Sequence, residues 1–126
     1  MKNKILILIL YTFVFVSIVN ARPANTKTDF SLMKDDCDFR STGHSCFRLG
    51  LYYIEHRLES KQGIKYLRKS CILGSGIGCM ALGELYKNGS FNYAIDYKKS
   101  KYYYDKACLN GEKLGCRAYN SLYKRR

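Results

Sequence analysis

The sequence predicts an all-α fold: a short α-solenoid of helix-turn-helix units stapled by disulfides at the repeat junctions. The segments CFRLGLYY, CMALGELY and CRAYNSLY begin at positions 46, 79 and 116, and they align on a first cysteine and a tyrosine seven residues later. Their spacing of 33 and 37 residues is typical of helix-turn-helix repeats. Within each segment, cysteine, leucine or tyrosine, and tyrosine recur at 0, 3 and 7, the spacing of one helical face. Pairs of cysteines eight or nine positions apart mark the boundaries between the repeats.

Residues 1–21 are predicted to be a secretory signal peptide. Lys2 and Lys4 form a basic start, an apolar run occupies 5–19, and Val-Asn-Ala at 19–21 supplies a small-residue cleavage site. The run is shorter than the ~20 mostly apolar residues of a spanning helix, which favours a cleaved signal over a retained anchor. We therefore expect a secreted or periplasmic protein with no stable membrane insertion after cleavage.

The mature chain is expected to be strongly basic. Loss of Lys2 and Lys4 with the signal leaves 20 basic and 10 acidic side chains, a net charge of +10, which favours anionic partners. Lysines adjoin tyrosines at 98–104 and the chain ends in Lys-Arg-Arg, a pattern that would suggest nucleic acid in a cytosolic protein. Export argues against nucleic acid. A solvated basic face is the simpler interpretation, and an anionic cell-surface polymer is the functional alternative.

The cysteines predict a disulfide framework. All six lie in the mature chain, at positions 37, 46, 71, 79, 108 and 116, and an oxidising compartment favours bridges over free thiols. Structural zinc sites usually pair ligands two to four residues apart. Here the gaps are eight or nine positions, and the histidines are only His44 and His56. We expect no metal and no cofactor.

The first elements of the repeat domain follow from this period. The domain is predicted at 28–126, after a linker at 22–27. It begins with a half unit at 28–45, in which Thr28 to Asp36 form a lone capping helix. The repeat at 46–78 contains one helix from about Ser45 to Arg57 and a second from about Gln62 to Leu73.

The second repeat, at 79–115, has the clearest signals for where its helices begin and end. Its first helix, from Cys79 to Tyr86, precedes Gly89, as a glycine follows a helix end. Its second helix is predicted from about 92 to 109, after a loop four residues longer than that of the first repeat. The last half unit, at 116–126, holds one helix, in which Asn120 replaces the glycine of the earlier units.

The junction CILGSGIGC predicts a bridge between repeats. In one continuous helix, the Cα atoms of Cys71 and Cys79 would lie about 12 Å apart. A disulfide requires less than about 7 Å. The three glycines between them favour a sharp reversal that brings the cysteines together, and Cys108 with Cys116 repeats the arrangement. Each such short-loop bridge contributes about 2 to 3 kcal/mol of stability.

These residues resemble the Sel-like repeat, a relative of the tetratricopeptide repeat. The pattern Ala/Cys-x-x-Leu-Gly-x-x-Tyr is followed by a glycine-containing loop, and the cysteine pairs at every junction are similar to those of the Helicobacter cysteine-rich protein family. The resemblance covers about 28–126 and implies a secreted or periplasmic protein. It also implies a third bridge, between Cys37 and Cys46, although this pair encloses eight residues and lacks the two-glycine pattern.

The resemblance further implies that the chain binds penicillin and acts as a slow β-lactamase. Ser31 with Lys34, and Ser121 with Lys124, match the Ser-x-x-Lys of serine β-lactamases, but Ser-Asp-Asn and Lys-Thr-Gly are absent. Matches of this kind arise by chance in a chain so rich in serine and lysine. The catalytic residues are therefore unknown, and the enzyme hypothesis depends on the family alone.

The architecture favours a different class of function. Stacked helical hairpins present a concave face that usually holds an extended peptide or a partner protein. Tyr53, Tyr86 and Tyr123 recur on the inner face and are candidate groove contacts, although helical spacing favours a packing role. The expected partners are a β-lactam or a cell-wall peptide-like ligand under the first hypothesis, and a protein or peptide under the second.

Overall fold

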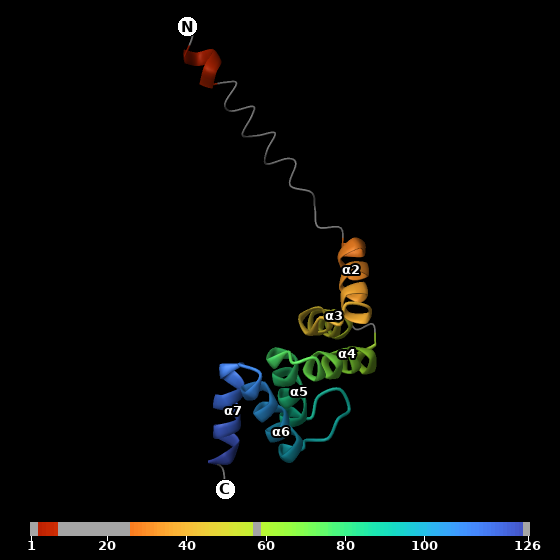
Figure 1. The fold of residues 1–126 in the computed structure, drawn as a ribbon, viewed down its shortest axis with the longest axis vertical. Helices are drawn as coiled ribbons and strands as arrows, with labels where there is room; N and C mark the ends of the chain where they lie inside the picture. Colours follow the sequence, from red (N-terminus) through yellow and green to blue (C-terminus); the bar gives the residue numbers. More distant parts are fainter. Residues whose placement is uncertain (1–2, 8–25, 57–58, 125–126) are drawn as a thin grey trace.

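The described part of the chain is a helical solenoid. The computed structural model describes residues 3–7, 26–56 and 59–124. The helices of the solenoid are α2 (Thr26–Asp38), α3 (Gly43–Glu55), α4 (Ser60–Ile72), α5 (Gly76–Asn88), α6 (Tyr97–Leu109) and α7 (Lys113–Tyr123). Each packs against the next along the chain, so that α2 and α7 lie at opposite ends of the stack (Figure 1). The described residues contain no strand, and the predicted all-α solenoid is confirmed.

Two kinds of helix alternate in this stack. Helix α3 contacts α5, and α5 contacts α7, in addition to their neighbours along the chain. Among the described helices, α2, α4 and α6 make no contact of similar extent with one another. The helices α3, α5 and α7 therefore lie on the inner side of the stack. The hairpins α3–α4 and α5–α6 are the two repeats, and α2 and α7 are half units.

The boundaries of α5 and α6 have identifiable causes. Gly89 adopts a left-handed φ of 65° and its amide donates to the carbonyl of Leu85, which ends α5. Asp96 caps α6 by accepting a hydrogen bond from the Lys99 amide at 2.9 Å. The start predicted for this helix, near residue 92, is wrong. Phe91 and Asn92 have φ values of 55° and 64°, which no right-handed helix accommodates.

Glycines allow the paired helices to approach closely. A Cβ at Gly50 of α3 would lie 2.9 Å from the carbonyl oxygen of Gly63 in α4. In the second hairpin, the carbonyl of Gly83 accepts a hydrogen bond from Ser100 Oγ at 2.8 Å, and the ring of Tyr104 lies against Gly83. Burial, and then a hydrogen bond to the Glu84 carboxylate, raise the pKa of the Tyr104 phenol well above its ordinary value.

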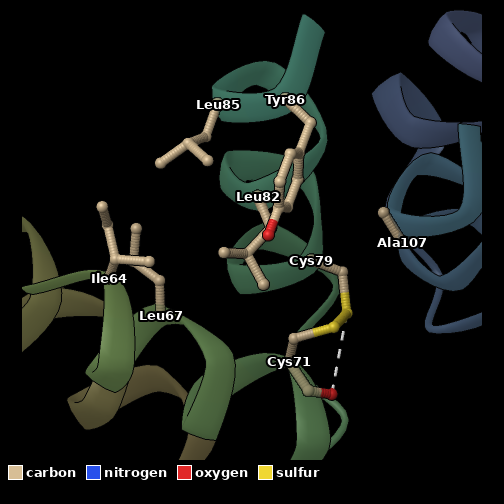
Figure 2. Close-up of a cluster of buried hydrophobic side chains, with 8 residues drawn as sticks. All are labelled: Ile64, Leu67, Cys71, Cys79, Leu82, Leu85, Tyr86 and Ala107. Carbon is tan, nitrogen blue, oxygen red and sulfur yellow. Dashed lines mark hydrogen bonds between the residues drawn. A yellow bond between two sulfur atoms is a disulfide. The ribbon is translucent and has the colours of Figure 1, made fainter. Parts of the chain in front are cut away.

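One hydrophobic cluster joins three helices across the two repeats. Figure 2 shows Ile64 and Leu67 of α4 facing Leu82 and Leu85 of α5, with Ala107 approaching from α6. Leu82 and Ala107 have no solvent exposure. The cluster also contains Cys71 and Cys79, so this disulfide is part of the core.

Three disulfides connect the units at their junctions. They join Cys37 to Cys46, Cys71 to Cys79 and Cys108 to Cys116, with Cα–Cα distances of 4.7, 4.5 and 4.5 Å. Each bridge spans the end of one helix and the start of the next, as predicted. Gly74 and Gly111 take left-handed φ values of 83° and 86° in the second and third junctions. Ser41, with a φ of 54°, reverses the chain in the first junction, which lacks the two-glycine pattern.

The predicted signal peptide and linker fall mostly outside the described residues. Residues 8–25 are not described, and neither are Arg57 or the last two arginines. Cleavage of 1–21 therefore stays a prediction. None of the helices in the described ranges is both long and apolar enough to cross a membrane.

Candidate binding surface

Charge is divided unevenly along the solenoid. Residues 26–56 hold 4 basic and 5 acidic side chains, whereas residues 59–124 hold 12 basic and 5 acidic ones. The first segment therefore carries a net charge of −1 and the second a net charge of +7. The basic character predicted for the whole mature chain is concentrated on α4 to α7.

The loops within the two hairpins meet beside this basic half. The connection from α3 to α4 comprises residues 56–59, while that from α5 to α6 comprises 89–96 and is four residues longer. A hollow of about 370 Å³ is lined by Glu59 and the start of α4 and by the α5–α6 connection. Its lining residues are Glu59, Ser60, Lys61, Phe91, Asn92 and Tyr93.

The longer loop, at 89–96, holds an aromatic residue in a strained backbone conformation. Phe91 is a bulky residue with positive φ and is 44% exposed, although an aromatic side chain gains stability from burial. Residues held in such sparsely populated conformations cluster at binding sites and other functional positions. Insertions within one repeat also tend to lie on the binding face of solenoids.

Basic side chains of α4 and α6 lie beside aromatic rings near the hollow. Lys61, Lys65 and Arg68 are exposed and share one helical stripe of α4. Arg68 donates to the hydroxyl of Tyr86 at 3.1 Å, and its guanidinium carbon lies 5.8 Å from the centre of the Tyr93 ring. Lys99 Nζ lies 5.2 Å from the centre of the Tyr86 ring. We call the following set the loop surface: Lys61, Lys65, Arg68, Phe91, Tyr93 and Lys99.

Two carboxylates lie at the loop surface and only partly balance its four cations. Glu59 lines the hollow. Oδ2 of Asp96 lies 3.6 Å from Lys99 Nζ, and Oδ1 of the same carboxylate accepts the hydrogen bond that caps α6. The hydrogen bond from the Lys99 amide holds the pKa of Asp96 below its ordinary value. Asp96 is therefore an anion committed to the helix cap, and the loop surface keeps an excess of positive charge.

The three tyrosines predicted as groove contacts have different environments. Tyr53 is half-buried and stacks on Tyr66 at 5.6 Å between ring centres. Tyr86 is only 6% exposed and stacks on Tyr103 at 5.7 Å, so the same stack recurs in each hairpin. Tyr123 is 51% exposed, and Lys101 Nζ lies 4.5 Å from the centre of its ring.

The loop surface was missed by the sequence analysis. Arg68 and Tyr86 are 18 positions apart, so no local pattern joins them. Two signals could have drawn attention to this surface. Three basic residues recur at i, i+4 and i+7 from Lys61, and the loop of the second repeat is longer.

The two Ser-x-x-Lys matches also differ in their surroundings. Ser31 is exposed on α2, and Lys34 is engaged by Asp38 at 2.9 Å. Ser121 and Lys124 instead line a hollow of about 540 Å³ on α7, together with Arg117 and Asn120. Only the second match therefore places its serine and lysine in one concave site.

Comparison with known proteins adds no family. Neither the models of known protein families nor the curated proteins match this chain. The Sel-like identity therefore rests on the residues quoted above, and it stays a prediction beside the observed helical repeats and disulfides.

Proposed function

We propose that this chain is an exported Sel-like repeat protein that binds an acidic segment of a partner protein or peptide at the loop surface. The observation that supports this function most directly is one hollow shared by the start of α4 and the α5–α6 loop, with Lys61 in its lining and Arg68 beside Tyr93. Arginine and lysine form strong charge-assisted hydrogen bonds with carboxylates. Phe91 and Tyr93 offer an apolar contact beside these cations.

Rigidity of the scaffold also supports a binding role. The stacked hairpins and the disulfides hold the loop surface in place before a partner arrives, which reduces the entropy lost on binding. Disulfides persist in oxidising compartments, and the apolar segment at 5–19 has the length of a signal h-region. We accordingly propose secretion or a periplasmic location.

A labelled acidic peptide tests this function. The probe is a fluorescein-tagged glutamate-rich peptide with interspersed phenylalanines, and a lysine-rich counterpart serves as the negative probe. We expect the oxidised protein to raise the anisotropy of the acidic probe alone, and added salt to weaken the binding because charge pairs contribute to it. The absence of binding at low salt would contradict the proposal.

A pair of matched variants localises the site. Replacing Lys61, Lys65 and Arg68 with glutamine should weaken binding at least about tenfold, the equivalent of 1.4 kcal/mol. The control replaces Lys113, Arg117 and Lys124 with glutamine, because it removes the same charge from α7. Equal losses in the two variants would show that net charge, and not the loop surface, attracts the peptide.

The second candidate function is penicillin binding with slow hydrolysis, as the family resemblance implies. The hollow on α7 favours it, because a serine there precedes a lysine by three residues and Arg117 offers a cation for a carboxylate. The test is penicillin hydrolysis by the oxidised protein and by Ser121→Ala, with Ser31→Ala as the matched control. Loss of turnover in Ser121→Ala alone would support this site. Equal turnover in all three proteins would exclude Ser121 as the nucleophile, and no turnover at all would refute hydrolysis.

A further inference from the structure

Each disulfide loop exposes apolar side chains to solvent. Phe39 is 83% exposed in the first junction, Ile72 80% in the second and Leu109 78% in the third. Ile72 and Leu109 occupy equivalent positions, directly after Cys71 and Cys108. We call the full set of these exposed apolar residues the junction edge: Phe39, Ile72, Leu73, Ile77, Leu109 and Leu114.

The three junctions form one continuous row. A Cβ at Gly43 in the first junction would lie 3.0 Å from Ser75 Cβ in the second. A Cβ at Gly76 in the second would lie 2.8 Å from Glu112 Cβ in the third. Asn110 of the third junction also donates to the Cys79 sulfur at 3.7 Å. The exposed apolar side chains therefore lie along a single edge of the solenoid.

The junction edge is separate from the loop surface. Helix α4 begins beside the loop surface at Ser60 and ends at the junction edge at Ile72. Thirteen residues of helix separate these two ends by about 18 Å. The two surfaces can consequently engage different partners at the same time.

The shape of the junction edge suits a partner whose apolar groups can rearrange around projecting side chains. Its side chains project singly from separate loops, each fixed by a disulfide and two of them turned by glycine. Exposed apolar side chains gathered along one edge, and not scattered over the surface, mark an interaction site. A protein partner would need a matching hollow for every projecting side chain, whereas lipid acyl chains rearrange around them.

Charge favours an anionic bilayer. Lys69, Lys106 and Lys113 lie within four residues of the bridging cysteines of the second and third junctions. The acidic residues near them are Asp105 and Glu112, and the Glu112 carboxylate caps α7 by accepting from the Leu114 amide at 3.1 Å. Asp38 in the first junction is paired with Lys69 at 3.2 Å. With Arg117, which directly follows Cys116, the three lysines outnumber Asp105 and Glu112, and basic residues near a membrane are attracted to anionic lipids.

We propose that the junction edge docks this protein onto the surface of an anionic lipid bilayer. Ile72 and Leu109 enter the interface between headgroups and acyl chains, and the neighbouring lysines contact the headgroups. This docking is peripheral, since no described helix is able to span a membrane. It presents the loop surface on the side of the protein that faces away from the bilayer.

Tryptophan reporters test the docking. The chain contains no tryptophan, so Ile72→Trp and Leu109→Trp each introduce a single fluorophore. The exported protein, with its N-terminus determined, is mixed with vesicles of phosphatidylcholine alone or of phosphatidylcholine with phosphatidylglycerol. We expect a blue shift, and quenching by brominated lipid, with the anionic vesicles only. Phe91→Trp is the matched control on the loop surface, and its emission should not change.

Removal of the apolar side chains gives an independent measurement. The double variant Ile72→Ser/Leu109→Ser should lower vesicle binding in co-sedimentation at least about tenfold, because two exposed apolar groups no longer enter the interface. The control Phe91→Ser/Ile95→Ser should remain within about twofold of the parent protein. Failure of the parent protein to bind anionic vesicles would overturn the proposal and leave protein docking as the use of this edge. An equal blue shift at Phe91→Trp would overturn it as well.

Discussion

The bridge between Cys71 and Cys79 offers the sharpest test of the solenoid. Replacing both residues with alanine removes a short-loop cross-link, which costs about 2 to 3 kcal/mol of unfolding free energy. Cys79 has no exposed surface and Cys71 is only 6% exposed, so the substitution also leaves space in the core. The two lost sulfurs add about 1 kcal/mol each. We expect a total loss of about 4 to 5 kcal/mol, a large part of a small domain's stability.

The bridge between Cys108 and Cys116 provides the control. It closes a loop of the same length, but both of its cysteines are only half-buried. Its double alanine variant should therefore lose only the cross-link contribution, about 2 to 3 kcal/mol. Urea unfolding followed by circular dichroism measures both variants against the oxidised parent. Equal losses, or a larger loss at 108–116, would refute the assignment of the 71–79 bridge to the core.

Three further predictions concern the covalent and local structure. Peptide mapping of the unreduced protein should recover only the three neighbouring pairings, and a crossed pair would contradict the stapled junctions. Gly63→Ala should destabilise the fold by about 1 to 3 kcal/mol in thermal melts, since its Cβ would lie 2.8 Å from the Gly50 carbonyl oxygen. Hydrogen bonds from Lys34 and then Lys69 hold the pKa of Asp38 below its ordinary 3.8. The ionised Asp38 carboxylate therefore stabilises the folded state above about pH 4, and this contribution is lost as the pH falls through the lowered pKa. Asp38→Asn should unfold less steeply with acid than the parent, and identical acid titrations of the two proteins would contradict this.

Most of the helices and the two glycine-containing junctions were predicted correctly because their signals are local, whereas the bridge between Cys37 and Cys46 was expected from the family resemblance. Helical spacing brings Cys79, Leu82 and Tyr86 to one face whatever surrounds them. The bridges at 71–79 and 108–116 each enclose seven residues and depend on a turn that glycine adopts. The start of α6 was wrong because the left-handed conformation of Phe91 has no signature in its residue type, although asparagine, as at position 92, tolerates such a conformation.

The sequence by itself therefore determined an all-helical repeat, the phase of its units and the position of two of its bridges, because each depends on residues close together in the chain. The tertiary structure alone decided which side chains share a surface. Arg68 reaches Tyr86 and Tyr93 only because α4 packs against the second hairpin. Likewise, the exposed residues of three separate disulfide loops form one edge only because the junctions stack on one another. Such surfaces are made by packing between units, and packing depends on contacts among residues far apart in the chain.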